Sequence, residues 1–186
     1  MSHKILIFTD LDGSLLDHFS YSYKAAEPLL SLFKDVGVPV IPVTSKTRAE
    51  LMALRTGLEN SHPFIVENGA AVFIPEDYFP VPPIGSTKMD GFYCFCFSKP
   101  RNHWLALLSR LEAEFSGEFE TFTSLGIQGI VDQTGLTDTA AELANKREFS
   151  EPVKWMSTES RKQVFAEVLQ KAGATVLQGG GLLNVK

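Results

Sequence analysis

Two carboxylates, Asp10 and Asp12, lie one residue apart just after a short apolar run at residues 5–8. Such a run is typical of a buried parallel strand, and open α/β sheets bind their ligands at the carboxyl ends of these strands. Two like charges about 4 Å apart repel by roughly 4 kcal/mol at an effective dielectric constant of about 20, whereas a hard divalent cation attracts both. The pair therefore predicts a Mg²⁺ site held by Asp10 and Asp12.

The same two aspartates suit phosphoryl transfer. One carboxylate can attack a phosphoryl group to form an aspartyl-phosphate, while a second acid protonates the leaving oxygen and later activates water. We assign the first role to Asp10 and the second to Asp12, and we expect Gly13 to turn the backbone so that its amide faces phosphate oxygens. The alternative is a strand that merely ends in an Asx turn.

A second group of polar residues follows the next predicted strand, at residues 38–43. Thr44, Ser45 and Lys46 come directly before a helix that opens on the capping box formed by Thr47 and Glu50. A hydroxyl, an ammonium group and a helix N-terminus at a strand's carboxyl end would together cradle a phosphate. Alternatively, Thr44 and Ser45 only cap this helix.

The segment 10–17, Asp-Leu-Asp-Gly-Ser-Leu-Leu-Asp, resembles motif I of the haloacid dehalogenase superfamily of phosphohydrolases, whose pattern is DxDG(T/S)L. The resemblance implies an α/β, Rossmann-like parallel-sheet core. It also implies that Asp10 is the nucleophile and Asp12 the acid/base. Thr44 stands at the superfamily's second motif, which binds the transferred phosphoryl group.

Later segments resemble the mannosyl-3-phosphoglycerate phosphatase branch of this superfamily. They are the strand end at 43–47, the Glu-Asn-Gly segment at 67–69, Thr-Gly-Leu at 134–136 and Arg-Glu-Phe-Ser-Glu-Pro at 147–152. The resemblance implies that Asn68 lies beside the active site, although a plain hairpin turn is the alternative. It also implies that Arg147 and Ser150 contact an anionic sugar-glycerate ester, since Arg binds carboxylates bidentately; Arg147 can instead be a solvated cation at a helix end.

A Pro-rich passage at residues 75–83 predicts a linker between two parts. We expect residues 1–80 to form a partial phosphatase core that carries both motifs. Residues 84–186 should form an α+β cap domain that covers the phosphate site. Its expected strands are 92–97, 118–122, 153–156 and 174–178, and its expected helices are 101–115, 137–147 and 158–172.

The family pattern continues with a Lys motif and a GDxxND motif that supplies a third metal carboxylate, and neither occurs in this sequence. The segment 178–186 resembles the family's QGGRFxH segment, but Gly181 replaces the Arg and Leu182 replaces the Phe. The resemblance therefore implies a C-terminally truncated relative whose core is incomplete. Strand 1 would then have a bare edge, which we expect to be buried in a homo-oligomer.

These observations predict a Mg²⁺-dependent phosphomonoester hydrolase of the mannosyl-3-phosphoglycerate phosphatase type, which the resemblance places in mannosylglycerate biosynthesis. Its substrate would be a small phosphorylated sugar-glycerate. One alternative is another sugar-phosphate phosphatase, sucrose-phosphatase-like or Cof-like. The other is a truncated, non-catalytic relative that binds phosphate ligands or self-associates.

Composition and patterning exclude other classes of function. The net charge is −5 and the basic residues are scattered, so we expect no nucleic acid partner. No apolar window reaches 18 residues and no secretory segment opens the chain, so we expect no membrane partner and a cytoplasmic location. Cys94 and Cys96 alternate in a predicted strand, and we expect two buried thiols that are poor disulfide partners.

Overall fold

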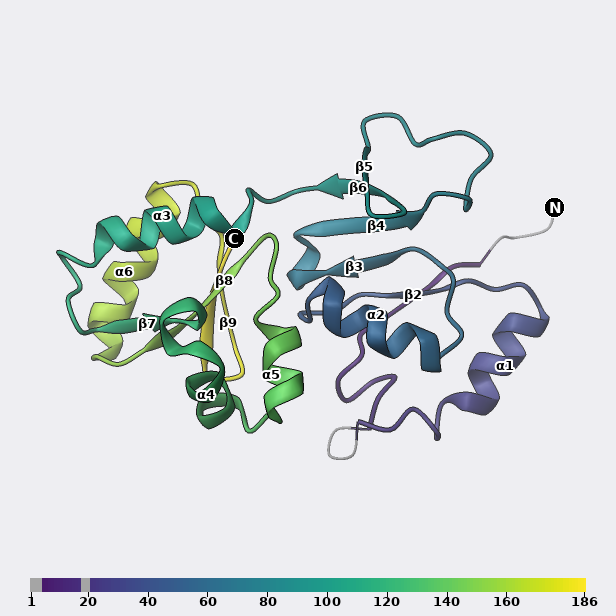
Figure 1. Cartoon of the computed structure of the whole chain (residues 1–186), viewed down its shortest axis with the longest axis horizontal. Coiled ribbons are helices and arrows are strands. Elements are labelled where there is room, and N and C mark those ends of the chain that lie inside the picture. The colour runs from purple at the N-terminus through teal and green to yellow at the C-terminus, as the bar shows by residue number, and fades with distance from the viewer. Residues whose placement is uncertain (1–4, 18–20) are drawn as a thin grey trace. The chain divides into compact units, whose positions relative to one another are not determined.

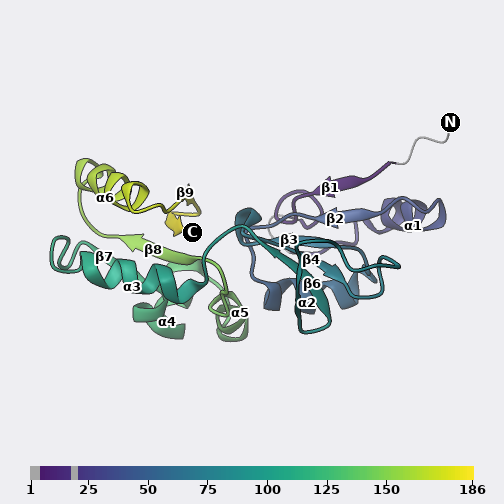
Figure 2. The same cartoon turned by 90° about the horizontal axis from the view of Figure 1, so that it is seen from above.

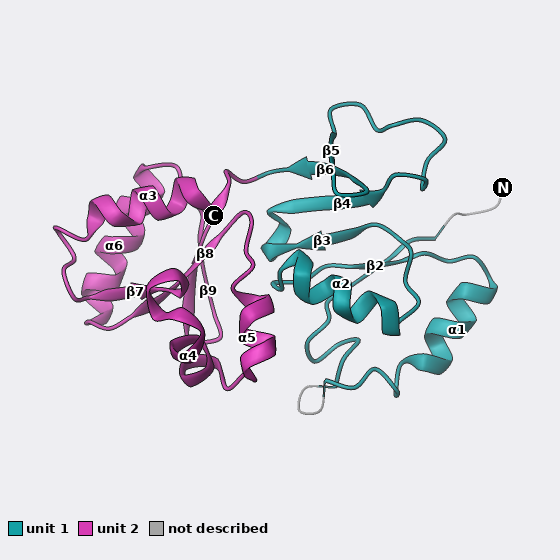
Figure 3. Cartoon of the chain, in the orientation of Figure 1, with its two compact units in different colours: residues 1–97 teal, residues 98–186 magenta. Residues whose placement is uncertain are grey.

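The computed structural model describes residues 5–17 and 21–186 (Figure 1). The chain divides into two compact units, residues 1–97 and 98–186 (Figure 3). The boundary therefore lies after Phe97 and not in the Pro-rich passage where we expected it. The reason is that β6 (Phe92–Cys96) pairs with β4 (Ala71–Pro75) and also with β5 (Thr87–Met89), so both strands after the Pro-rich passage belong to the first unit.

The first unit begins with a short parallel arrangement of strands. β1 (Ile7–Thr9) runs parallel to β2 (Val40–Pro42), with Ile7 opposite Val40. A parallel bridge between Val43 and Ile65 then joins the end of β2 to β3 (Phe64–Val66). From β3 onward the pairing is antiparallel, in the order β3-β4-β6-β5. The predicted parallel core is thus present in the first three strands, and an antiparallel meander extends it.

Helix α2 (Arg48–Gly57) begins where the sequence predicts. Thr47 Oγ1 accepts a hydrogen bond from Glu50 N at 3.1 Å, and Glu50 Oε2 accepts one from Thr47 N at 2.8 Å. This reciprocal capping box satisfies amides that an open helix end would otherwise present to a ligand. It also fixes the point at which the chain leaves the loop after β2.

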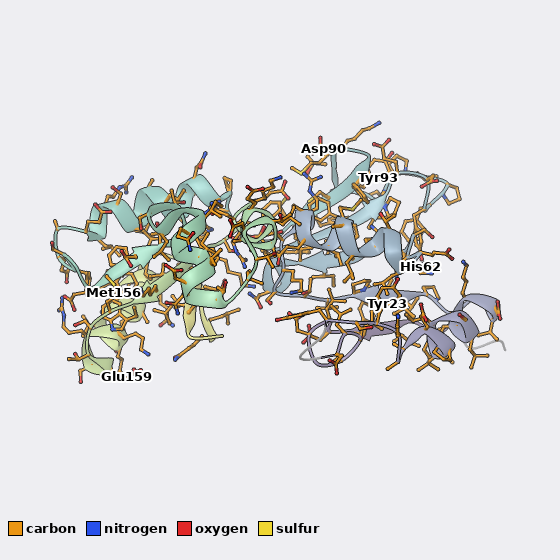
Figure 4. The ribbon with its side chains drawn as sticks, turned by 60° about the horizontal axis from the view of Figure 1, so that its bottom comes forward. Tyr23, His62, Asp90, Tyr93, Met156 and Glu159 are labelled. Atoms are coloured by element: carbon orange, nitrogen blue, oxygen red, sulfur yellow. The ribbon has the colours of Figure 1, made fainter. Side chains whose placement is uncertain are left out.

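The connection from α2 to β3, where Figure 4 labels His62, is held by a buried arginine. Arg55 donates from Nε to Asn60 O at 2.9 Å and from Nη2 to His62 O at 2.7 Å. Its guanidinium carbon lies 4.4 Å from the centre of the Phe64 ring, and burial lowers its pKa to about 10. Asn60 Nδ2 in turn donates to Val40 O at 2.9 Å, which ties the loop to β2 and sets β3 beside it.

Strand β1 is more exposed than its apolar sequence predicts. Ile5, Leu6 and Phe8 are 56–60% exposed, because β1 pairs with β2 alone among the described strands. Figure 2 shows β1 at the outer margin of this unit. Helix α1 (Glu27–Asp35) buries none of its residues. The expectation of a buried first strand is therefore wrong, while the expected open edge is present.

The second unit has the predicted α+β composition. Its four-stranded antiparallel sheet has the order β7-β8-β10-β9. The strands are β7 (Phe119–Thr121), β8 (Glu151–Trp155), β9 (Val176–Gly179) and β10 (Leu182–Val185), and the helices are α3 (Arg101–Leu111), α4 (Phe122–Thr134), α5 (Asp138–Ala144) and α6 (Glu159–Lys171). Leu183 packs with α3 and α6, whereas its neighbour Leu182 packs with α4 and α5. Since side chains alternate along a strand, helices cover both faces of this sheet.

A buried ion pair joins four elements of the second unit. Glu151 is fully buried and accepts hydrogen bonds from Arg101 Nε and, at 2.9 Å, from Thr123 N. Arg101 Nη2 also donates to Asn145 Oδ1 at 2.8 Å. The start of α3, the start of α4, the end of α5 and the edge of β8 are therefore joined through the Arg101–Glu151 pair.

We predict that Glu151→Ala lowers the free energy of unfolding of the second unit by about 3 kcal/mol or more, because it leaves the Arg101 charge buried without its carboxylate. Both tryptophans, Trp104 and Trp155, lie in this unit, so their fluorescence during urea unfolding reports on it. The control is Glu120→Ala, whose half-exposed partner Lys154 lies 3.5 Å away and should contribute less than about 1 kcal/mol. Equal losses in the two variants would contradict the assignment.

Candidate active site

The loops that follow β1 and β2 lie at the same edge of the sheet. Val43 N donates to Thr9 O at 2.8 Å, so the two strands end level with each other. Asp10 follows the first strand and Thr44 follows the second. The structure thus confirms that Asp10 and Thr44 belong to one edge of the sheet.

An ion pair joins these two loops. Lys46 Nζ lies 3.0 Å from Asp12 Oδ2, and the two side chains are 18% and 37% exposed. The same ammonium group lies 5.3 Å from the centre of the Tyr21 ring. Two residues predicted independently, from the strand 1 and strand 2 patterns, are therefore in direct contact. At this partly buried position the pair is screened less than a surface ion pair.

Backbone hydrogen bonds connect a third loop to the second. Asn68 N donates to Thr44 O at 3.0 Å, and Glu67 N donates to Lys46 O at 3.0 Å. Glu67 to Gly69 form a short 3-10 turn in which Asn68 has a φ of 60°, a left-handed conformation that Asn tolerates. The segment is therefore part of the site's framework, as the resemblance implies, and it is not a plain two-residue hairpin turn.

Thr44 itself is nearly buried, at 3% exposed. Its Oγ1 accepts a hydrogen bond from Lys46 N at 3.1 Å. Thr47 caps α2, so the alternative in which Thr44 caps this helix is wrong. Ser45 is exposed at the tip of the same loop. The Thr44 side chain shapes the turn that carries Lys46.

Gly13 has the positive φ, 73°, that its predicted turn requires. Its amide donates to Leu16 O at 3.0 Å, because Asp12 and Leu16 form a short bridge across the turn. In this structure the Gly13 amide is thus engaged within its own turn, and its contact with a phosphate stays a prediction. A cavity of about 440 Å³ adjoins the turn, with Gly13 in its wall.

A second cavity, of about 660 Å³, lies elsewhere in the first unit. Tyr23 and His62 stand in its wall (Figure 4). Its lining contains none of the three loops described above, so its greater volume does not mark the site of chemistry. Burial, aided by the charge of Arg55, lowers the pKa of His62 and so favours the neutral imidazole.

The aspartate pair fits a Mg²⁺ ion by its donor atoms. Asp12 Oδ1 is buried and no hydrogen-bond donor among the described residues reaches it, which is an arrangement that an ion resolves. Asp10 is exposed, and its Oδ1 accepts a hydrogen bond from Leu11 N at 2.7 Å. Within residues 5–17 and 21–186, no three His, Cys, Asp or Glu side chains group closely enough to hold a metal. Mg²⁺ would thus take its remaining oxygen ligands from water and phosphate, as it commonly does.

Two predicted residues, Arg147 and Ser150, belong to the second unit. Ser150 is fully buried, and its Oγ accepts a hydrogen bond from Arg147 Nη1 at 3.0 Å. With no exposed surface, the Ser150 hydroxyl holds the guanidinium and does not present itself to a ligand. Arg147 is partly exposed. Ser150 of the same unit thus orients the Arg147 guanidinium, so Arg147 is more than a solvated cation at a helix end.

Glu67 is a residue of this site that our sequence reasoning did not single out. It is fully buried, directly after β3, with a φ of 49°. A carboxylate that ends an apolar strand is the same signal that identified Asp10, so the pattern was present in the sequence.

We predict that Thr44→Val increases the rate of amide hydrogen exchange at Lys46, because the variant removes the acceptor of that amide. Leaving such a donor unsatisfied costs about 1 kcal/mol or more, which corresponds to roughly five-fold faster exchange. The control is Thr44→Ser, which keeps the hydroxyl. Exchange at the natural rate in the Val variant would show that the hydroxyl does not hold the turn.

No protein-family model matches this chain, but curated proteins do. This chain is 37% identical to a glucosyl-3-phosphoglycerate/mannosyl-3-phosphoglycerate phosphatase of Methanococcoides burtonii. The alignment spans 177 residues, which are 95% of this chain and 65% of that protein. A protein of the same description from Persephonella marina is 35% identical over 181 residues, with coverage of 95% and 64%. The chain thus spans just under two thirds of the length of these relatives.

Solved structures share the fold at lower identity. A haloacid dehalogenase-like hydrolase from B. subtilis superimposes with a TM-score of 0.61 at 17% identity, over 97% of this chain and 72% of that one. A sugar phosphatase of subclass IIB in the same superfamily gives a TM-score of 0.61 at 14% identity, over 98% of this chain and 69% of that one.

In the part of the chain that the structure describes, no helix is long and apolar enough to cross a membrane.

Proposed function

Since the chain belongs to the haloacid dehalogenase superfamily and, within it, to the family of the glucosyl-3-phosphoglycerate/mannosyl-3-phosphoglycerate phosphatases, we propose that it is a Mg²⁺-dependent phosphomonoester hydrolase. The observation that carries the proposal is the 3.0 Å contact between Asp12 and Lys46, which joins the loops of both predicted motifs. An acid pair, a cation and a turn that holds Thr44 then occupy one edge of the sheet.

In the proposed reaction, an Asp10 carboxylate oxygen attacks phosphorus and displaces the substrate's alkoxide oxygen, to which Asp12 gives a proton. Asp12 next takes a proton from water, which attacks the aspartyl-phosphate and releases inorganic phosphate and the Asp10 carboxylate. Asp10 and Asp12 would hold Mg²⁺, which supplies neutralising charge near the phosphoryl oxygens. Lys46 adds positive charge at the same edge, beside Asp12.

We further propose a phosphorylated sugar-glycerate as the substrate class. The relatives, at 35–37% identity, carry that specificity in their names, which favours it over a sucrose-phosphatase-like or Cof-like preference. The second unit would act as the cap. Its Arg147, which Ser150 holds in place, would bind the carboxylate of the glycerate. The cytoplasmic location stays a prediction from the sequence.

A non-catalytic role is the second candidate, and one observation favours it. Apolar residues of β1 (Phe8) and α1 (Leu29 and Leu32), together with Val36 just after α1, are 52–61% exposed. Such residues and a strand edge without a partner favour association with another chain. We therefore propose a homo-oligomer in which this surface is buried, whether or not the chain is active.

We predict that Asp10→Asn lowers the rate of phosphate release from glucosyl-3-phosphoglycerate in Mg²⁺ by at least about a thousand-fold, because the amide is a poor nucleophile. The control is Asp35→Asn, an exposed acid at the end of α1, which should keep the natural rate. An undiminished rate in Asp10→Asn would refute the assignment of the nucleophile. No phosphate release by the natural chain, with its fold intact, would refute the catalytic proposal and leave the second candidate.

We predict from the exposed surface that the chain is a dimer or larger in light scattering, and that Leu32→Glu makes it monomeric by placing a charge in the interface. The matched control is Ile84→Glu, at a position that is 99% exposed in the loop before β5, and it should leave the mass unchanged. A natural chain that is monomeric at all concentrations would contradict the interface.

A further inference from the structure

Strand β6 places two thiols side by side in the first unit. Cys94 and Cys96 lie two residues apart on one face of the strand, with their sulfur atoms 3.3 Å apart. Cys94 is buried and Cys96 is exposed, and neither is in a disulfide. The expectation of two buried thiols is therefore wrong for Cys96, which gives the pair an open side.

The strand pairing works against closing a disulfide between them. Two residues of extended strand separate the Cα atoms by about 6.6–6.8 Å, the upper limit for a disulfide. Cys94 is paired on both sides, with Phe73 of β4 and Thr87 of β5. The strand cannot contract there without breaking its hydrogen bonds. A single atom that bridges both sulfurs requires no contraction.

The separation of the sulfurs selects the bridging atom. With sulfur bonds of about 2.3 Å, two sulfurs 3.3 Å apart subtend an angle of about 90° at the atom between them. A linear two-coordinate ion would need them about 4.6 Å apart. A tetrahedral ion would need further protein ligands, and no third His, Cys, Asp or Glu joins the pair among the described residues. A pyramidal trivalent atom with one organic substituent satisfies both conditions, because its bond angles are close to a right angle and it needs only two protein ligands.

We propose that Cys94 and Cys96 form a dithiol site that binds monosubstituted trivalent arsenicals through both sulfurs. The reaction exchanges bonds without oxidation or reduction: an arsine oxide, R–As=O, takes two S–H groups to form two As–S bonds and one water molecule. Cys96 reacts first because it is exposed. Ala71, the residue opposite Cys96 on β4, has a side chain too small to crowd the bridge.

The site adjoins the framework of the candidate active site. Phe97 N, one residue after Cys96, donates to Ala70 O at 2.8 Å, and Ala70 N donates to Glu67 O at 3.2 Å. Glu67 begins the turn that is bonded to the loop carrying Lys46. An adduct on β6 therefore lies next to the third loop of the site.

The test is intact-mass spectrometry of the natural, folded chain after reaction with one equivalent of phenylarsine oxide. We expect a one-to-one adduct that has lost two protons, that survives an excess of monothiol and that dithiothreitol removes. Cys96→Ser should reduce retention after the monothiol wash at least ten-fold, and Cys94→Ala should do the same. The chain has no other cysteine, so each variant holds a single thiol.

Two comparisons make the result decisive. The folded chain should retain the arsenical better than the urea-unfolded chain, because folding holds the sulfurs together. Adduct formation only after unfolding, or equal retention by Cys96→Ser and the natural chain, would overturn the proposal. Capture of both thiols as a disulfide under the same conditions, with no arsenic bound, would overturn it as well.

Discussion

The parallel register of β1 and β2 is the constraint on which the candidate site depends. Since Thr9 lies opposite Pro42, the two strands end level and deliver Asp10 and Thr44 to the same edge. A slip of one residue would turn every side chain of β1 to the opposite face and separate the two motifs. The bridge from Val43 to Ile65 extends this alignment to the third loop. Strand pairing, more than any side chain, therefore assembles the site.

Charge then determines how the assembled loops behave. Asp12 places one oxygen against Lys46 and keeps the other buried, while Asp10 faces solvent. A buried carboxylate oxygen without a donor is costly unless a cation or proton reaches it. We propose that this cost gives the edge an affinity for a metal ion. In this proposal the positive charge comes from Lys46 and a metal and not from the amides of the helix end, so the capping box of α2 is compatible with the site.

The sequence predicted what is encoded locally. The capping box at Thr47 and the α+β composition of the second unit each rest on neighbouring residues, and both are present. Helix α4 was missed because Gly126, with a φ of 64°, interrupts its periodicity, and β10 was missed because its strand pattern follows a Gly-rich turn. The burial of Ser150 was not predictable either, because it depends on contacts distant in sequence, such as that between Arg101 and Glu151.

We propose that the loops after β1, β2 and β3 form one site for Mg²⁺ and phosphate. A titration of the isotope-labelled chain with Mg²⁺, followed through its backbone amide NMR signals, tests it most directly. We expect the shifted signals to cluster at residues 10–13, 44–46 and 67–69, and we expect Asp12→Asn to abolish the shifts in all three loops together. Shifts confined to other surfaces, or shifts in one loop that leave the other two unchanged, would show that the three loops do not form one site.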